Sequence, residues 1–405
     1  MTLAESIADD LAGDVTDDLI FKARGLVPML RANAERAERE RRLPEANLDA
    51  LRAAGLLRLS LPRRHGGHEL GVRSFLRVCA ELGRGCGSTA WVATLLNTNL
   101  YTASAFTDRA RAEIFDGNPD AALSGVILGS GVSIERVDGG YRVSGQWGFA
   151  TGCLHADWAV LGRTPEDPGD SHAALLVPMQ DLSVRDTWNV VGMAGTGSNT
   201  LVAEQVFVPE HRAVVLSRST TDEVFSSAAD PNGWQDQAVR RAVLVLGIAA
   251  PLLGLAQYAY ELVTDSLNNG RRIAYSDYRD ARNSATIQLA LGRAAHLIDS
   301  SWMHALRSAD DLDRAESTRS SLDEFTQMRV RTDTAVVARE CRAAVETLLD
   351  VNGAGSFSCG NPLQRVWRDL EVASRHGIIN PLMADEGMGR LAAGAVPQSA
   401  RSEQR

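Results

Sequence analysis

Apolar and polar positions follow two different rhythms along this chain of 405 residues, and the rhythm changes twice. In residues 1–118 the apolar side chains recur every three or four positions with charged residues between them, as in segments 17–42, 44–59 and 72–85. This spacing is typical of amphipathic helices. Pro44 suits the first turn of a helix, where its missing N–H has no partner to lose. The pattern therefore predicts an N-terminal α-helical domain over residues 1–118.

From residue 119 to residue 216 the period falls to two, which is typical of strands with one buried face. Asp138, Gly139 and Gly140 separate two alternating runs, and glycine supplies the positive φ that a tight hairpin needs. Turn residues separate four further short runs, at 157–163, 172–178, 182–191 and 199–209. We expect a central all-β domain over residues 119–216.

Residues 217–237 are polar and rich in turn formers, which predicts a linker or surface loop. The helical period then returns, and segments 286–313 and 325–353 are each long enough for a helix of many turns. We expect a C-terminal helical bundle domain over residues 238–405, with a polar, frayed tail after Leu391.

Residues 242–260 carry no charge, and their length is that of a membrane-spanning helix. The segment nevertheless contains Pro251 and Gln257, is rich in alanine and glycine, and stands alone in the chain. A helix that is apolar on all sides can equally be the buried centre of a helical domain. We therefore predict a buried helix and no membrane association.

The order α, β, α differs from the alternation of strands and helices in nucleotide-binding α/β folds. The chain has no GxGxxG motif after a strand and no GxxxxGK[ST] motif, so a nicotinamide-binding Rossmann domain and a P-loop are not expected. Acidic residues outnumber basic ones by 51 to 42, giving a net charge of −9, which argues against nucleic-acid binding.

The five cysteines are scattered along the chain without a CxxC pair, at Cys79, Cys86, Cys153, Cys341 and Cys359. This spacing predicts neither a disulfide framework nor a metal site, and it fits a reducing compartment. The first residues are acidic and lack the apolar core of a signal peptide, so we expect a cytoplasmic protein.

Five local strings occur in an order that resembles the acyl-CoA dehydrogenase superfamily over about residues 20–385. They are RRLPEANLDALRAAGLLRLSLPRRHGG, GGYRVSGQWGFATG, GMAGTGSNTLVAEQVFVPEH, GLAQ and NGAGSFSCGNPLQRVWRDL. The resemblance implies an α+β, acyl-CoA dehydrogenase-like fold with an N-terminal helical domain, a central β-barrel domain and a C-terminal four-helix bundle. It also implies a homotetramer with flavin sites at the subunit contacts.

The catalytic base of the dehydrogenases is a glutamate that commonly lies eight residues after the aspartate of the RD pair. Here that aspartate is Asp369, the position eight residues later is Gly377, and its neighbour is His376. Glu386 falls too late to match, and Glu261, on the helix near GLAQ, is left open as a displaced base. The missing base resembles the flavin-dependent monooxygenase branch, as do the strings CGSTAWVATLLNTN and TWNVVGMAGTGS.

That branch includes two-component hydroxylases of phenols and aromatic polyketides, compounds typical of antibiotic biosynthesis, which receive reduced FMN or FAD from a separate flavin reductase. The resemblance implies that the reduced flavin reacts with O2 to a C4a-hydroperoxide, which then oxygenates an aromatic or polyketide-like substrate. Three alternatives remain open: an acyl-CoA dehydrogenase or oxidase, an N-oxygenase of amines or amino sugars, and a flavin-free binding or assembly protein. The sequence does not separate FMN from FAD or identify the substrate.

Thr151 matches the family residue that faces flavin N5, and its hydroxyl can both donate and accept a hydrogen bond. Trp147 and Phe149 precede it at strand spacing, so one of them is expected against the flavin ring and the other in the core. His376 is the catalytic candidate, because an imidazole can deprotonate a phenol or protonate a leaving oxygen. The structural alternative for His376 is a histidine at a helix C-terminus with Gly377 as the cap.

Three residues on one predicted helix and one in a turn are candidates for substrate binding. Asn97 and Asn99 follow Trp91 in a mostly apolar stretch, and their amides bind either substrate or neighbouring backbone groups. Trp91 is a core or substrate-contact residue. His155 follows Thr151 by four positions and is expected to contact the residues that bind the ligand and hold them in position.

The resemblance also implies contacts with the flavin phosphates. Arg271 or Arg272 matches the region that reaches the flavin of a neighbouring subunit, since a guanidinium suits a phosphate. Ser198 offers a hydroxyl and an N–H to a phosphate or to the edge of the flavin ring. Gly353 and Gly355 allow a flavin to approach the backbone closely across a subunit interface. Ordinary turns and a solvated helix surface are the structural alternatives. Ala194 departs from the family, where relatives often carry a basic residue.

Overall fold

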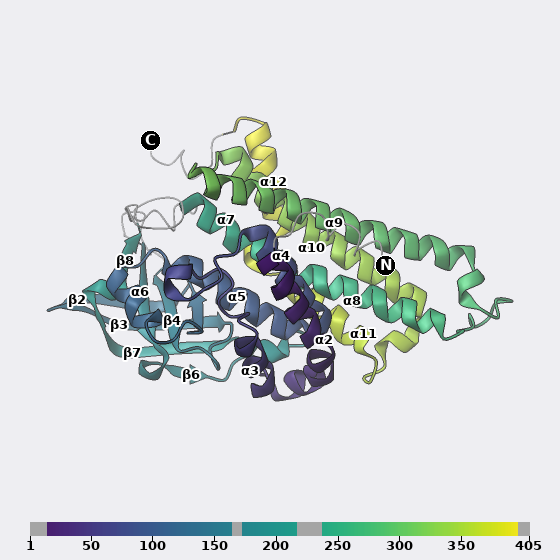
Figure 1. Ribbon diagram of the computed structural model, residues 1–405, viewed down its shortest axis with the longest axis horizontal. Coiled ribbons are helices and arrows are strands. Elements are labelled where there is room, and N and C mark those ends of the chain that lie inside the picture. The colour runs from purple at the N-terminus through teal and green to yellow at the C-terminus, as the bar shows by residue number, and fades with distance from the viewer. Residues whose placement is uncertain (1–13, 164–171, 217–236, 396–405) are drawn as a thin grey trace.

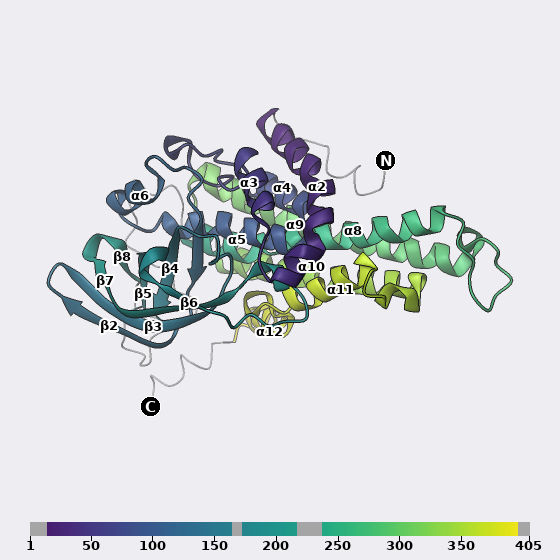
Figure 2. The same ribbon diagram turned by 90° about the horizontal axis from the view of Figure 1, so that it is seen from below.

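The computed structural model describes residues 14–163, 172–216 and 237–395. Helices form both ends of the chain and strands form the middle, as the hydrophobic period predicts (Figure 1). The predicted linker at 217–237 and most of the tail after Leu391 lie outside the described residues. The two views in Figures 1 and 2 place the sheets at one end of the molecule and the long helices at the other.

The N-terminal helices are α2 (Asp14–Glu40), α3 (Glu45–Ala53), α4 (Val72–Gly85), α5 (Gly87–Ala103) and α6 (Asp108–Phe115). Pro44 is the N-cap residue of α3 and therefore precedes the first helical turn in which we expected it. The N-terminus of α4 is capped from a distant part of the chain. Asp313 accepts hydrogen bonds from the amides of Val72 at 2.5 Å and Arg73 at 3.1 Å.

The β region consists of two four-stranded sheets, with strand orders β1-β4-β5-β8 and β2-β3-β7-β6. The strands are β1 (Leu123–Val126), β2 (Ser130–Val137), β3 (Gly140–Ala150), β4 (Trp158–Arg163), β5 (His172–Pro178), β6 (Ser183–Arg185), β7 (Asn199–Pro209) and β8 (Ala213–Leu216). Among the described strands, only β1 and β4 pair in parallel. The predicted hairpin joins β2 to β3.

The expected β-barrel is wrong in its closure, because among the described strands neither sheet pairs its two edges. The sheets instead enclose a shared core that includes Trp147, Leu161, Leu175 and Leu201. Alternating apolar positions establish that each strand has a buried face. They do not establish which edges meet, because closure depends on pairing between distant segments.

The C-terminal helices are α7 (Gln237–Gly247), α8 (Ala249–Asn268), α9 (Ala285–Thr318), α10 (Glu324–Asn352), α11 (Pro362–Ala373) and α12 (Pro381–Ala392). The C-terminal helical domain is thus confirmed. Figure 1 shows the long helices α9 and α10 side by side, and α8 packs on both of them and on α4.

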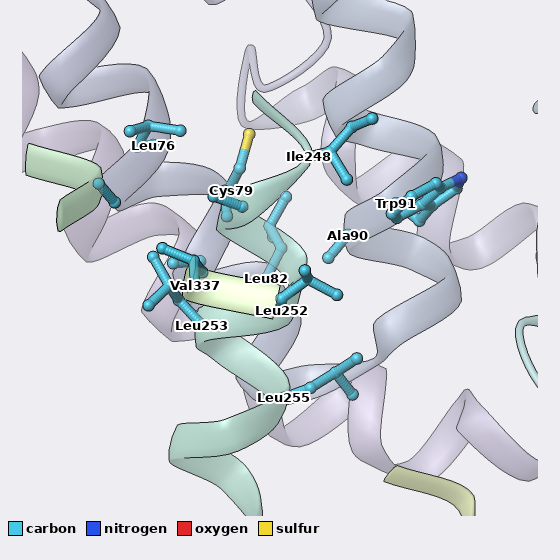
Figure 3. Packing of buried hydrophobic residues seen from close by; sticks show 14 of the residues in the cluster. Leu76, Cys79, Leu82, Ala90, Trp91, Ile248, Leu252, Leu253, Leu255 and Val337 are labelled. Carbon is cyan, nitrogen blue, oxygen red and sulfur yellow. The ribbon is translucent and has the colours of Figure 1, made fainter. Parts of the chain in front are cut away.

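The charge-free segment is long and apolar enough to cross a membrane, but most of it is buried inside the protein. Figure 3 shows part of this buried cluster, to which Leu252, Leu253 and Leu255 of α8 and Leu82 of α4 belong. The predicted single helix is two helices, with a break at Ile248. Pro251 explains the break, because it has no N–H to donate to the carbonyl four residues earlier.

Helices α4 and α8 cross with their backbones in contact. A Cβ atom on Gly254 would lie 2.1 Å from the carbonyl oxygen of Ala80 and 2.7 Å from Cα of Gly83. Only glycine fits at this crossing, which joins the N-terminal helices to the C-terminal ones.

Candidate functional site

Three buried hydroxyls meet where β3 ends, beside the loop that precedes β7. Thr151 Oγ1 lies 2.8 Å from Ser198 Oγ, which lies 2.8 Å from Thr196 Oγ1. Thr196 in turn donates to the carbonyl oxygen of Met193 at 2.8 Å. The Ser124 hydroxyl donates to the Thr151 carbonyl at 2.9 Å and fixes that backbone. The structure thus brings together two predicted site residues, Thr151 and Ser198.

The loop from 187 to 199 takes its shape from unusual backbone conformations. Its short 3-10 turn η3 (Ala194–Thr196) is flanked by Met193 and Gly197, both with positive φ. The Asn199 side chain accepts hydrogen bonds from the amides of Thr187 and Trp188, each at 3.0 Å. Ala194, the departure from the family, is buried in this turn, so the position has no exposed cation to offer.

Helix α11 holds this loop from behind through the two residues of the RD pair. Asp369 is buried and accepts the Met193 amide at 2.5 Å, while Arg368 donates to the Val191 carbonyl and pairs with Glu38. Burial raises the pKa of the Asp369 carboxyl to about 6. In the sequence, Asp369 served only as the reference from which the position of the dehydrogenase base was counted. Its contact with Met193, 176 positions away, leaves no pattern in the neighbouring residues.

Phe149 and Trp147 have opposite surroundings. Trp147 is fully buried between the sheets and donates its indole N–H to the Gly162 carbonyl at 2.7 Å. Phe149 is 76% exposed, and its ring meets the edge of Trp188 with 5.6 Å between centroids. Trp188 donates to the Met193 carbonyl at 3.0 Å. Phe149 and Trp188 are therefore the aromatic residues that can reach a ligand here, and Trp147 is a core residue.

His376 lies between α11 and α12, where it caps the short turn η7 (Gly377–Ile379). Its Nδ1 accepts the Ile378 amide at 3.3 Å, and its ring centroid lies 5.8 Å from that of Trp91. Desolvation by the surrounding protein lowers the pKa of His376, although part of the side chain reaches solvent. Gly377 starts η7, and Ser374 takes the helix C-cap that we expected of Gly377.

The remaining residues proposed for substrate binding are mostly engaged inside the protein. Asn97 is fully buried, accepts from the Leu59 amide, and donates to the carbonyls of Leu56 and Ala93. The structural alternative therefore describes Asn97. Asn99 donates to the Leu123 carbonyl at 2.8 Å and is only partly buried.

Trp91 is buried, and its ring packs beside that of His376. His155 is partly buried, and its Nε2 is enclosed without a hydrogen-bond partner among the described residues. Burial first, and then the charges of Arg42 and Arg52, lower the pKa of His155 to about 4. His155 is therefore neutral at physiological pH.

Arg271, Gly353 and Gly355 form a second group at the ends of α8 and α10. Arg271 donates to the Asn352 side chain at 2.5 Å and to the Val351 carbonyl at 2.7 Å. A Cβ atom on either glycine would meet open space, whereas Arg272 projects into solvent. Figures 1 and 2 show the connection between α8 and α9, which begins beside Arg271, at the end of the molecule farthest from the sheets.

Glu261, the remaining candidate for a dehydrogenase base, is held by two arginines. It pairs with Arg31 at 2.5 Å and with Arg84 at 2.7 Å, and Arg31 also lies over the ring of Tyr258. Each oxygen of the Glu261 carboxylate is thus engaged by a guanidinium group, so neither oxygen is free to meet a substrate.

Comparisons with known proteins match both helical parts of the chain. The acyl-CoA dehydrogenase N-terminal domain matches residues 26–111, and the acyl-CoA dehydrogenase C-terminal domain matches residues 246–381. The chain is 32% identical to the FADH(2)-dependent resorcinol hydroxylase, oxygenase component, of Rhizobium sp. (strain MTP-10005), with 89% of this chain and 90% of that protein covered. It is 29% identical to the flavin-dependent monooxygenase, oxygenase subunit HsaA, of Rhodococcus jostii (strain RHA1), over 88% of this chain and 93% of that one.

Among solved structures, XiaF from Streptomyces sp. in complex with FADH2 and glycerol superposes with a TM-score of 0.86. The two chains are 32% identical, and the match covers 98% of this chain and 99% of XiaF.

Proposed function

This chain belongs to the two-component flavin-dependent monooxygenases with the acyl-CoA dehydrogenase fold, and we propose that it hydroxylates an aromatic or polyketide-like small molecule. It is an oxygenase component that uses reduced flavin and O2, and a separate flavin reductase supplies the reduced flavin. Because its relatives include an FADH(2)-dependent hydroxylase and a complex with FADH2, we favour reduced FAD over reduced FMN.

The proposal rests on one observation, which is the identity and the contacts of the side chains that could exchange a proton with substrate. The glutamate of a dehydrogenase is absent from its common position, and the substitute Glu261 is held by Arg31 and Arg84. An imidazole, His376, stands one residue before the common position, with part of its side chain open to solvent. This set of groups suits an oxygenase and disfavours removal of an α-proton from an acyl thioester.

The residues at the end of β3 fit a flavin ring. A flavin is apolar on its faces and polar along its edge, and Phe149 with Trp188 offers an aromatic surface beside the Thr151 hydroxyl. When bound, reduced flavin activates O2 for insertion of one oxygen atom. The protein positions the ring and excludes water from it.

His376 presents a hydrogen-bond donor toward the site. Its Nδ1 is occupied by the Ile378 amide, so the neutral ring carries its proton on Nε2. That Nε2–H donates to an oxygen atom of the substrate or of the reacting oxygen. Of the two roles that the sequence left open, this arrangement favours the donor over the base.

The positions of the two groups of flavin residues support a site built from two subunits. Thr151 follows β3, whereas Arg271 follows α8 and Gly353 and Gly355 follow α10. Figures 1 and 2 show these ends of α8 and α10 far from the sheets. A second copy of the chain would supply the Arg271 group to the first copy's flavin. The proposal also includes a cytoplasmic homotetramer, in which each chain has a C-terminal four-helix bundle and domain boundaries near residues 118, 216 and 237.

The alternatives have less support from this chain. The hydroxyl chain at Thr151 has no evident purpose in a flavin-free binding protein. N-oxygenation has no specific residue in its favour, and a role in antibiotic biosynthesis depends on the substrate.

An anaerobic stopped-flow experiment tests the proposed function. The protein is mixed with reduced FAD, then with oxygenated buffer containing a phenol or naphthol, and absorbance and product are followed. A transient species distinct from oxidised flavin, together with a hydroxylated product, supports the proposal. Direct reoxidation without product at every substrate contradicts it, and bleaching of the oxidised flavoprotein by an acyl-CoA would instead indicate a dehydrogenase.

A further inference from the structure

We infer that Ser198 and Thr196 are positioning residues that fix the Thr151 hydroxyl as a hydrogen-bond acceptor toward the flavin, which favours reduced flavin over oxidised flavin. The inference rests on the proposed function, because it takes Thr151 as the residue that meets flavin N5. It follows from counting hydrogens along the chain of three hydroxyls.

The chain of hydroxyls ends on a group that can only accept. The Met193 carbonyl has no hydrogen, so the 2.8 Å contact with Thr196 requires Thr196 to donate. The single hydroxyl hydrogen of Thr196 is then used. Ser198, at 2.8 Å from Thr196, must therefore donate to Thr196.

The same argument reaches Thr151. Since the Ser198 hydrogen points to Thr196, the 2.8 Å contact between Thr151 and Ser198 requires Thr151 to donate. The Thr151 hydroxyl hydrogen thus points into the protein, and its remaining lone pair is the feature that it offers to a ligand. All three side chains are buried, so water does not compete for these bonds.

Flavin N5 changes its hydrogen-bonding character with redox state. Reduced flavin carries a hydrogen on N5 and donates there, whereas oxidised flavin has only a lone pair on N5 and accepts. An acceptor at Thr151 therefore complements reduced flavin and leaves oxidised flavin with two lone pairs facing each other. An oxygenase component that receives reduced flavin and releases oxidised flavin benefits from this difference.

Three variants test the direction of the chain without altering Thr151. Ser198→Ala removes the acceptor for Thr151, and Thr196→Val removes the acceptor for Ser198, so in both the Thr151 hydrogen becomes free to face the flavin. Ser198→Thr keeps the hydroxyl and restores the chain. Thr200→Val is the matched control, because it removes a hydroxyl from the exposed pair Thr187–Thr200, two residues beyond Ser198 near the start of β7.

The measurement is the dissociation constant of the protein for reduced FAD under anaerobic conditions and for oxidised FAD in air. We expect wild type, Ser198→Thr and Thr200→Val to share one ratio of oxidised to reduced constants. Ser198→Ala and Thr196→Val lower that ratio by about fivefold or more, which is the effect of about one hydrogen bond. Circular dichroism and thermal melting establish that each variant is folded.

Two failures are distinguishable. If wild type prefers reduced FAD and both chain-breaking variants keep its ratio, the inference is wrong and the proposed function stands. If wild type binds reduced FAD no better than a non-flavoprotein does, the proposed function itself fails. Should Thr196→Val not fold, Ser198→Ala alone decides the outcome.

Discussion

The Met193 amide donates a hydrogen bond to the Asp369 carboxylate across 2.5 Å, which fastens the loop at 187–199 to helix α11. Met193 has a positive φ, and its neighbour Gly192 has no room for a Cβ atom, which would lie 2.1 Å from the Arg368 carbonyl oxygen. The loop that carries Thr196 and Ser198 therefore takes its position from α11.

Asp369 gives the protein a pH-dependent stability that Asp369→Asn should remove. The folded protein holds this proton more tightly than the unfolded chain, in which the carboxyl titrates near pH 3.9. As the pH rises from about 4 to about 7, the unfolded chain gives up this proton before the folded protein does. The free energy of unfolding therefore falls over this range. Urea titrations should show wild type losing up to about 3 kcal/mol relative to Asp369→Asn over this range. A constant difference between the two would contradict the prediction.

His376→Ala should separate flavin binding from hydroxylation. The variant is expected to bind reduced FAD normally but to yield about tenfold less hydroxylated product, with more hydrogen peroxide, because the Nε2–H donor is lost. His376→Asn, whose amide also donates, should recover part of the yield. Product and peroxide are measured together in single-turnover reactions at several pH values. Full product formation by His376→Ala at every pH would exclude the role.

Glu261→Gln should weaken the fold and leave the chemistry unchanged. The substitution removes charge from a site where Arg31 and Arg84 converge, at a cost of about 1–2 kcal/mol in the free energy of unfolding. The yield of hydroxylated product per reduced FAD should stay that of wild type. A loss of more than about tenfold with normal flavin binding would revive Glu261 as a catalytic base.

Asp313→Ala should destabilise the protein through the N-terminus of α4. Two amides, of Val72 and Arg73, lose their acceptor, and such a cap contributes about 1–2 kcal/mol. Asp310→Ala is the matched control, since Asp310 pairs with the Arg73 side chain at the surface and contributes less than about 1 kcal/mol. Equal losses in urea titrations of the two variants would contradict this assignment.

Hydrophobic period alone predicted the main helices and the β2–β3 hairpin, because these patterns are local. It could not distinguish Trp147 from Phe149, which strict alternation places on one face of β3. The pairing of β3 with β7 shifts register between Trp147 and Ala150, and Phe149 has a φ of 60°. A bulge at this point turns Phe149 outward while Trp147 stays in the core.

The sequence singled out candidate residues for the site but not the residues that hold them in place. Thr151, Ser198 and His376 lie in strings that resemble a family. The hydrogen-bond partners of Glu261 and Asn97 come from distant segments. Arg31 is 230 positions from Glu261, and Leu56 is 41 positions from Asn97. No local pattern encodes such pairs, so only the folded chain shows that Asn97 is satisfied internally.

The glycine crossing of α4 and α8 has a consequence for the order in which the protein can be made. The N-terminal helices meet the backbone of α8 at Gly254, with the whole β region between them in sequence. While the ribosome is still translating that β region, α4 has no partner for the face that carries Gly83. The first half of this protein therefore leaves the ribosome before its hydrophobic core can be completed. A chain truncated before α8 should bind chaperones and be degraded by proteases.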